Sequence, residues 1–189
     1  MADIETELGI SANYFVMLRS TSYNLFCVES CRIIEKLLKG EHSIGLHFMS
    51  ELCEKDGIQS MVEKILAEVN LIEQEFGMSV SAMSFHQPSE GILRENIFIG
   101  TLINTYNRIQ MKDYCYISDS NMTWKHENPG EIFTRRIYSR LQLLIHPMWW
   151  TNESMSLKEK WLDVLKTNTN VVTKHWEQRE RTLRNTSLI

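Results

Sequence analysis

Short apolar runs of β-strand length alternate along this chain with longer segments that carry apolar residues at helical spacing. The extended runs cover residues 11–18, 43–48, 79–85, 101–106, 114–117 and 141–145. The helical segments cover residues 1–8, 28–38, 58–76 and a C-terminal region of about 156–184. Apolar strands that alternate with helices are typical of a parallel sheet covered by helices, so the pattern predicts an α/β fold.

The clearest helix is predicted over residues 58–76. Met61, Ile65, Val69 and Ile72 recur there at intervals of three and four residues, which places them on one face. Gly77 follows directly and is a typical residue just past a helix C-terminus. This segment is therefore expected to cover one face of the sheet.

The size and composition of the chain are those of an ordinary globular domain. Its 189 residues are 43% hydrophobic and 23% charged, and no internal repeat or Pro/Gly-rich linker divides them. We expect a single domain over residues 1–189. The net charge is −4 and the Lys and Arg residues are scattered, so we expect no nucleic-acid partner.

Cysteine usage and hydropathy bear on the compartment. The four cysteines, Cys27, Cys31, Cys53 and Cys115, lack the paired spacing of a zinc site and are expected to stay reduced as small apolar side chains. No apolar run approaches the roughly 20 residues of a membrane span, and the first residues do not have the pattern of a secretion signal. We therefore expect a cytoplasmic protein with no membrane span.

Each of three predicted strands has a histidine at or just after its C-terminal end. His47 ends the first of these strands, His86 the second and His146 the third. The carboxyl ends of parallel strands meet at one edge of a sheet, so we expect the three imidazoles to lie close together. Imidazole is the commonest metal ligand and the usual proton shuttle near neutral pH. His42, at the opposite end of its strand, is expected to be structural.

Asp119 and two tryptophans follow later strands. Asp119 comes just after the run 114–117, where it is placed either to orient a histidine or hold a metal, or to form a polar turn with its Ser and Asn neighbours. Trp149 and Trp150 follow His146 and either floor a sugar-binding cleft or pack in the core.

These motifs, taken in order, resemble a known family. Residues 13–15, 23–26 and 41–48 are similar to motifs of the polysaccharide deacetylase (NodB-homology) superfamily. Residues 84–88, 116–120 and 143–150 look like later motifs of its bacterial branch, which is associated with surface-glycan (O-antigen) biosynthesis. The resemblance covers residues 1 to about 150.

The resemblance implies a distorted (β/α) barrel that holds one divalent metal, usually zinc. In that family the metal and an Asp activate water to attack the acetamide carbonyl of an N-acetylated sugar or glycan precursor. By this resemblance we expect a set of catalytic, substrate-binding and metal-binding side chains. The catalytic residues are His146 and Asp119, the substrate-binding residues are His86, Pro88, Trp124 and Trp149, and the metal ligands are His47 and His86.

Two departures from the family pattern bear on activity. The Asp-rich motif on the family's first strand would precede residues 1–8, and Asp3 cannot replace it because Asp3 lies on the predicted helix. The second metal histidine of the family is replaced by Glu51, and the Asp of the bacterial branch by Met49. We therefore expect an incomplete barrel without its first strand, impaired hydrolysis, and an exposed sheet edge through which copies of the chain pair as a homo-oligomer.

Three hypotheses follow. The first is an impaired metal-dependent deacetylase that acts on N-acetyl groups. The second is a catalytically inactive module of the same fold that binds glycan or protein through Trp124, Trp149 and Trp150. The third is an unrelated metallohydrolase with a histidine-rich barrel. Metal content and hydrolysis of an N-acetyl sugar distinguish them.

Overall fold

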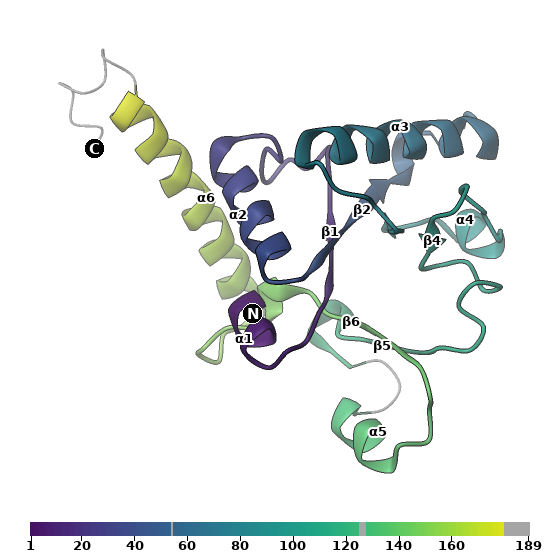
Figure 1. Ribbon diagram of the computed structural model, residues 1–189. Helices are drawn as coiled ribbons and strands as arrows, with labels where there is room; N and C mark the ends of the chain where they lie inside the picture. Colours follow the sequence, from purple (N-terminus) through teal and green to yellow (C-terminus); the bar gives the residue numbers. More distant parts are fainter. Residues whose placement is uncertain (54, 125–127, 180–189) are drawn as a thin grey trace. The chain divides into compact units, whose positions relative to one another are not determined.

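A four-stranded parallel sheet organises the first part of the chain. The computed structural model describes residues 1–53, 55–124 and 128–179, and its contacts divide the chain into two units, Met1–Lys112 and Asp113–Ile189. In the first unit the strands are ordered β1-β2-β3-β4 and every pair is parallel (Figure 1). The four strands are β1 (Asn13–Val16), β2 (Ser43–Met49), β3 (Ala82–His86) and β4 (Ile103–Asn104).

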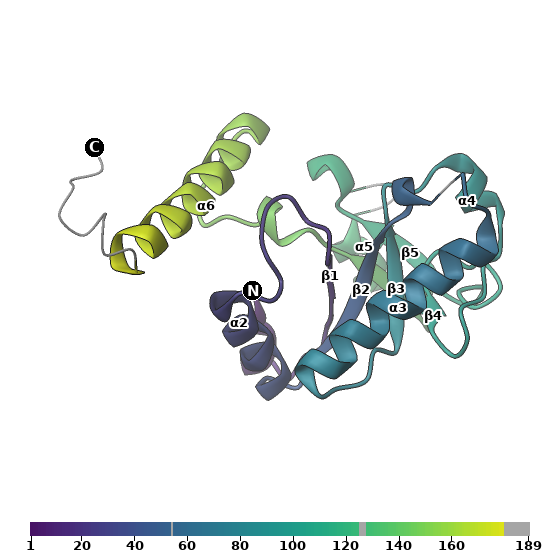
Figure 2. The same cartoon turned by 90° about the horizontal axis from the view of Figure 1, so that it is seen from above.

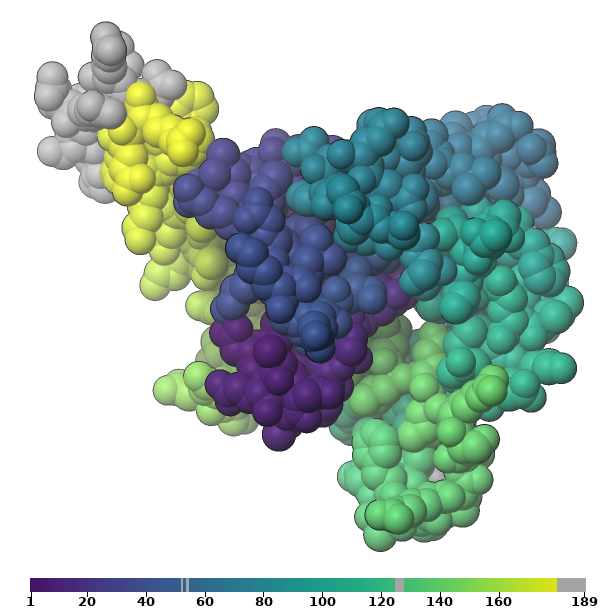
Figure 3. Space-filling model, in the orientation of Figure 1, coloured from purple at the N-terminus to yellow at the C-terminus, as the bar shows by residue number. Residues whose placement is uncertain are grey.

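Helices connect these strands and cover one face of the sheet. The helices of this unit are α1 (Ala2–Glu7), α2 (Val28–Lys39), the 3₁₀ turn η1 (Ser50–Leu52), α3 (Ile58–Phe76) and α4 (Glu90–Arg94). Figures 1 and 2 show α3 lying along the sheet, and in Figure 3 the surfaces of α2 and α3 adjoin one another. The prediction of an α/β fold with parallel strands is therefore confirmed.

The core lies between the sheet and these helices. Side chains alternate between the two faces of a strand, so Leu46 and Phe48 share one face of β2. These side chains are 0% and 1% exposed, and Phe85 on β3 is 1% exposed. Ile65 and Ile72 of α3 are also fully buried in this cluster. The apolar stripe predicted from the sequence is thus the face of α3 that contacts the core.

The ends of α3 are those expected from its sequence. The helix begins after Gly57 and ends at Gly77, which has a left-handed φ of 61° and donates its N–H to the Glu73 carbonyl. Glycine adopts this conformation without the clash that a Cβ would introduce, so it ends the helix at low cost. The predicted range 58–76 is confirmed.

His42 joins α1 to the sheet. Its imidazole is 4% exposed, and its Nδ1 accepts the backbone N–H of Ala12 at 3.2 Å. Its Nε2 lies 3.1 Å from the Thr6 hydroxyl. These bonds agree with the structural role predicted for His42. Asp3 lies on α1, where it forms an ion pair with Lys36 of α2 at 2.6 Å.

Residues 101–106 differ from the extended run predicted for them. Only Ile103–Asn104 form a strand, and the loop around it is held by buried asparagines. The side-chain amides of Asn104 and Asn107 both donate to the Ile97 carbonyl, at 3.0 and 3.1 Å. The Asn104 side-chain oxygen also accepts the Tyr106 N–H at 3.0 Å, and this local turn directs the chain away from the ladder.

The second unit contains a separate two-stranded parallel sheet. Its elements are β5 (Cys115–Ser118), η2 (Ser120–Met122), α5 (Pro129–Arg135), β6 (Leu141–Leu144), η3 (Pro147–Trp149) and α6 (Leu157–Arg179). The expectation of a single sheet is therefore replaced by two sheets. The short β4 and the loop that follows it provide no long strand to continue the first ladder. The barrel itself stays a prediction.

The C-terminal region forms one helix in the described residues. Ser156 and Glu159 form a capping box: the Glu159 carboxylate accepts the Ser156 N–H at 2.7 Å, and the Ser156 hydroxyl accepts the Glu159 N–H at 3.3 Å. Of the predicted region 156–184, residues 180–184 lie outside the described residues. No helix among the residues that the structure describes is both long and apolar enough to cross a membrane.

The four cysteines are free thiols. Cys53 is buried in the core of the first unit, as predicted for a small apolar side chain. Cys27, Cys31 and Cys115 are partly exposed. Burial and the carboxylate of Glu75 raise the pKa of the Cys31 thiol, which favours its protonated form.

Candidate functional site

His47 and His86 form a pair on neighbouring strands of the first sheet. Met49, the last residue of β2, lies opposite His86 of β3 in the register. His47 is two residues before Met49, so its side chain lies on the same face of the strand as that of Met49. The Nε2 of His47 lies 3.3 Å from the Nδ1 of His86, with the ring planes 82° apart. One of these two ring nitrogens therefore donates to the other.

Gly45, two residues before His47, leaves space for the ring of Phe15. Gly45 lies on the same face of β2 as His47, opposite Phe15 of β1. A Cβ at position 45 would come within 2.6 Å of the Phe15 ring. Glycine is required here because the aromatic ring lies across the backbone of β2, and this packing fixes the strand that carries His47.

The histidine pair could supply two of the ligands that a catalytic zinc needs. Such zinc sites take three protein ligands and leave one position for water. Within the described part of the chain, no group of three or more His, Cys, Asp or Glu side chains is placed to hold a metal ion. Glu51, at the position where the sequence resemblance implied a second histidine, is exposed on η1. The described residues thus do not complete a zinc site.

Pro88 follows the end of β3. Gln87 has a left-handed φ of 44°, and Ser89 caps α4 by accepting the Ile92 N–H at 3.5 Å. Pro88 lies between this turn and the cap, where its missing N–H ends the strand pairing. Its predicted contact with substrate stays a prediction.

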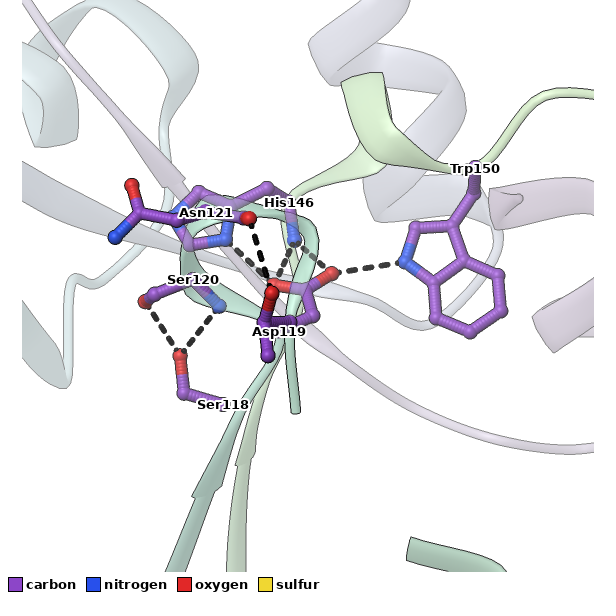
Figure 4. Close-up of polar contacts among 7 residues, drawn as sticks. Ser118, Asp119, Ser120, Asn121, His146 and Trp150 are labelled. Atoms are coloured by element: carbon purple, nitrogen blue, oxygen red, sulfur yellow. Dashed lines mark hydrogen bonds and ion pairs between the residues drawn. The ribbon is translucent and has the colours of Figure 1, made fainter. Parts of the chain in front are cut away.

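Asp119 and His146 form a polar pair in the second unit. Ser118 lies opposite Leu144, so the chain leaves β5 and β6 at the same end and places Asp119 beside the segment that begins after Leu144. The Oδ1 of Asp119 lies 2.6 Å from the Nδ1 of His146, and the His146 backbone N–H donates to both carboxylate oxygens at 3.0 and 3.1 Å (Figure 4).

This geometry defines which nitrogen of His146 is available for chemistry. Its Nδ1 carries the proton that the carboxylate accepts, so Nε2 is the nitrogen that can take up or release a proton. Asp119 is 4% exposed, whereas the side chain of His146 is 39% exposed. A buried carboxylate that orients a partly exposed imidazole is an arrangement suited to general acid–base chemistry.

Trp150 completes this polar cluster. Its indole Nε1–H donates to the Oδ2 of Asp119 at 2.9 Å, on the other oxygen from the one nearest the His146 ring. Figure 4 shows the indole and the imidazole on opposite sides of the carboxylate. The sequence motif placed Trp150 near His146 but gave no sign of this bond.

Aromatic rings surround the pair. The Trp124 and Trp150 rings lie 6.0 Å apart, and the Trp149 ring lies 6.0 Å from the His146 ring. Trp161 of α6 contacts Trp149 at 6.2 Å. Trp124 and Trp149 were predicted to bind substrate, whereas no site role was predicted for Trp161. Its position in the first turns of α6, close to the capping box, is what brings it to the cluster.

Lys160 attaches α6 to the segment that carries the tryptophans. The residue is 7% exposed, and its ammonium donates to the main-chain carbonyl of Trp149. The Trp149 N–H in turn donates to the His146 carbonyl at 2.9 Å. The first turn of α6 therefore holds the short helix η3 next to His146.

The predicted site residues thus fall into two groups, one in each unit. His47 and His86 lie together in the first unit, where Pro88 follows two residues after His86. Asp119 and His146 lie together in the second unit, among tryptophans that include Trp124 and Trp149. The catalytic, substrate-binding and metal-binding roles of these residues stay predictions.

Comparisons with solved structures give a distant likeness. No protein-family model and no curated protein sequence match the chain. Among solved structures, the chain is similar to a mutant of BA3943, described as a CE4 family pseudoenzyme, with 11% sequence identity and a TM-score of 0.44. The match covers 90% of this chain and 56% of that one, so the chain spans little more than half of that protein.

Proposed function

We propose that this chain is a deacetylase-like domain that binds an N-acetylated sugar or glycan precursor and hydrolyses its acetamide at a low rate. The observation that carries the proposal is the buried Asp119 carboxylate bonded to both His146 and Trp150. It combines an oriented acid–base group with exposed aromatic surface, and these are the two components that the chemistry of a glycan amide requires.

His146 serves as the acid–base group in this proposal. His146 Nε2 takes a proton from the water that adds to the acetamide carbonyl carbon, and gives that proton to the sugar nitrogen as the C–N bond breaks, so the sugar leaves as an amine. The second product is acetic acid, which ionises to acetate at neutral pH. Asp119 holds the imidazole by its Nδ1 and stabilises the imidazolium that forms in the cycle.

The tryptophans supply the sugar-binding surface. Trp150 is 53% exposed while its N–H is bonded to Asp119, so its ring has a fixed edge and an open face. Aromatic rings bury the apolar C–H face of a sugar with little loss of side-chain freedom. A sugar stacked on Trp150 or Trp124 would have its N-acetyl group within reach of His146.

The rate is proposed to be low because the described residues offer only a partial metal site. His47 and His86 are the residues we propose to bind a divalent ion, with zinc as the first choice. A bound ion would polarise a carbonyl and acidify water. With two ligands in place of three, the ion is expected to bind weakly, and no role of His146 depends on it.

The second candidate function is a glycan-binding module without catalysis. The same observation favours it. The Asp119–His146 pair is joined by hydrogen bonds, whereas among the described residues no three-ligand group is placed for a metal. The two candidates share the ligand class and the residues that contact it. They differ in whether acetate is released.

Two finer parts of the proposal come from the family resemblance, namely an incomplete (β/α) barrel and a role in the synthesis of bacterial surface glycans such as O-antigen. We propose a cytoplasmic location because the four cysteines are free thiols. We also propose that copies of the chain pair through β1, which is the end strand in the order of the first sheet.

Acetate release and glycan binding together test the proposal. The full chain is incubated with zinc and a chito-oligosaccharide, acetate is measured enzymatically, and binding is measured by calorimetry. We expect saturable binding and slow acetate release that is lost in His146→Ala and kept in His175→Ala, a control on exposed α6. Binding without acetate release supports the module; absence of both refutes the proposal.

A further inference from the structure

The Asp119 carboxylate accepts hydrogen bonds from three donors on two residues. The His146 Nδ1 lies 2.6 Å from Oδ1, and the Trp150 Nε1 lies 2.9 Å from Oδ2. The backbone N–H of His146 contacts both oxygens. Every donor in this set is neutral except the imidazole, which gains a positive charge when it is protonated. The strength of the indole bond therefore affects how strongly the carboxylate attracts the imidazolium.

The backbone of residues 146–150 holds Trp150 in this position. The Trp149 N–H donates to the His146 carbonyl at 2.9 Å, and the Trp150 N–H donates to the Pro147 carbonyl at 3.1 Å. These bonds form the turn η3, which brings the chain back toward Asp119. An indole that is half exposed would ordinarily bond to water, yet this one is bonded to a carboxylate that is 4% exposed.

We propose that Trp150 is a positioning residue that acts through Asp119: its indole N–H fixes the carboxylate toward His146 and lowers the proton affinity of the imidazole. A hydrogen bond from the indole stabilises the negative charge on Asp119 by itself, and this leaves less of that charge to be neutralised by an imidazolium. The meaning of this for catalysis depends on the proposed function, whereas the effect on His146 does not.

Other groups near His146 are the same in the wild type and in a variant that lacks the Trp150 N–H. The Trp149 ring contacts the imidazole, and the Lys160 ammonium is bonded to the Trp149 carbonyl. Neither group bonds to Asp119 through its side chain in the described structure. Removal of the Trp150 N–H therefore changes one contact of the carboxylate and leaves these neighbours in place.

The test is an NMR titration of the His146 ring proton in the full chain. In Trp150→Phe we expect the titration midpoint to move to higher pH, which corresponds to a roughly two- to fivefold gain in proton affinity, from the size of one hydrogen bond. Trp124→Phe is the control, because Trp124 contacts the Trp150 ring and does not bond to Asp119. Its midpoint should equal that of the wild type.

A second variant keeps the test valid if Trp150→Phe fails to fold. Replacing Trp150 with β-(3-benzothienyl)alanine keeps the shape of the ring system and removes only the N–H donor. The same upward movement is expected. An unchanged or lower midpoint in the variant that folds overturns the proposal. If the midpoint rises while the chain binds no glycan, the positioning role stands and the proposed function fails.

Discussion

Asp119 follows β5 and His146 follows β6, and these paired parallel strands end side by side. The Asp119 carboxylate accepts both the backbone N–H and the ring Nδ1–H of His146. Because Asp119 is 4% exposed, little water competes for these bonds. The pair is therefore expected to be important both for the stability of residues 113–179 and for the reactivity of the imidazole.

Asp119→Asn should destabilise the chain and lower its activity. The neutral amide replaces a charged acceptor for three donors, which we expect to cost about 1–3 kcal/mol of unfolding free energy. Any acetate release should fall at least about tenfold, since the imidazole loses its anionic partner. Denaturant unfolding and the acetate assay measure the two effects. Asp163→Asn, at an exposed position of α6, is the matched control. Equal stability of both variants would contradict the prediction.

Gly45→Ala should destabilise the first sheet. The added Cβ would come within 2.6 Å of the Phe15 ring, so either the ring or β1 must move. Overpacking of this kind costs roughly 1–3 kcal/mol. Chemical denaturation measures the loss, and Phe15→Leu introduced together with Gly45→Ala should recover part of it. Gly91→Ala is the control, because its nearest neighbour, the Ser89 hydroxyl, lies 3.7 Å from the new Cβ. Equal losses at positions 45 and 91 would show that the ring contact is unimportant.

Tyr14 should make the stability of the chain sensitive to alkaline pH. Burial, together with the hydrogen bond that its hydroxyl donates to Glu5, raises the pKa of the Tyr14 phenol well above its ordinary value. A raised folded-state pKa stabilises the native state below the unfolded pKa of about 10, and this contribution is lost as the pH rises further.

We therefore expect Tyr14→Phe to be less stable than the wild type by about 1 kcal/mol at pH 7. The difference should shrink as the pH rises above about 10, because only the wild type then loses the contribution of the phenol. Urea unfolding between pH 7 and 11 measures both chains, with Tyr116→Phe, a half-exposed position of β5, as the control. A difference that grows with pH would contradict this assignment.

Much of the fold could be predicted from the sequence because the apolar spacing reports burial directly. The stripe of Met61, Ile65, Val69 and Ile72 predicted α3 with its correct ends, since Gly77 adopts the left-handed conformation that stops a helix. The short helices α4 and α5 were missed. With five residues in α4 and seven in α5, each helix is shorter than two full turns. The start of α5 depends on the cap that Asn128 forms by accepting the Gly130 N–H.

The division into two sheets could not be predicted, because strand length does not reveal pairing. Residues 101–106 carry the apolar residues of a strand, yet the Asn104 side chain accepts the Tyr106 N–H and the chain turns away from the ladder. Polar side chains that bond locally to the backbone compete with strand pairing, and their effect depends on which carbonyl lies nearby. This information is absent from hydrophobic periodicity.

The proximity of Asp119 and His146 could be predicted because the ends of two parallel strands determine it. Parallel strands place the residues after them side by side, and this is why Asp119 and His146 could be named as candidates. The bond from Trp150 to Asp119 was not foreseen, since it requires the turn of η3 to bring residue 150 back by hydrogen bonds that no sequence pattern encodes.

We propose that an N-acetylated sugar binds beside Asp119, His146 and Trp150. The most direct measurement is an NMR titration of the full chain with N,N′-diacetylchitobiose, and with the deacetylated disaccharide as the matched ligand. We predict saturable shifts of the His146 ring proton and the Trp150 indole N–H with the acetylated sugar, and much smaller shifts with the other. Unchanged resonances of both residues at millimolar acetylated sugar would contradict the account.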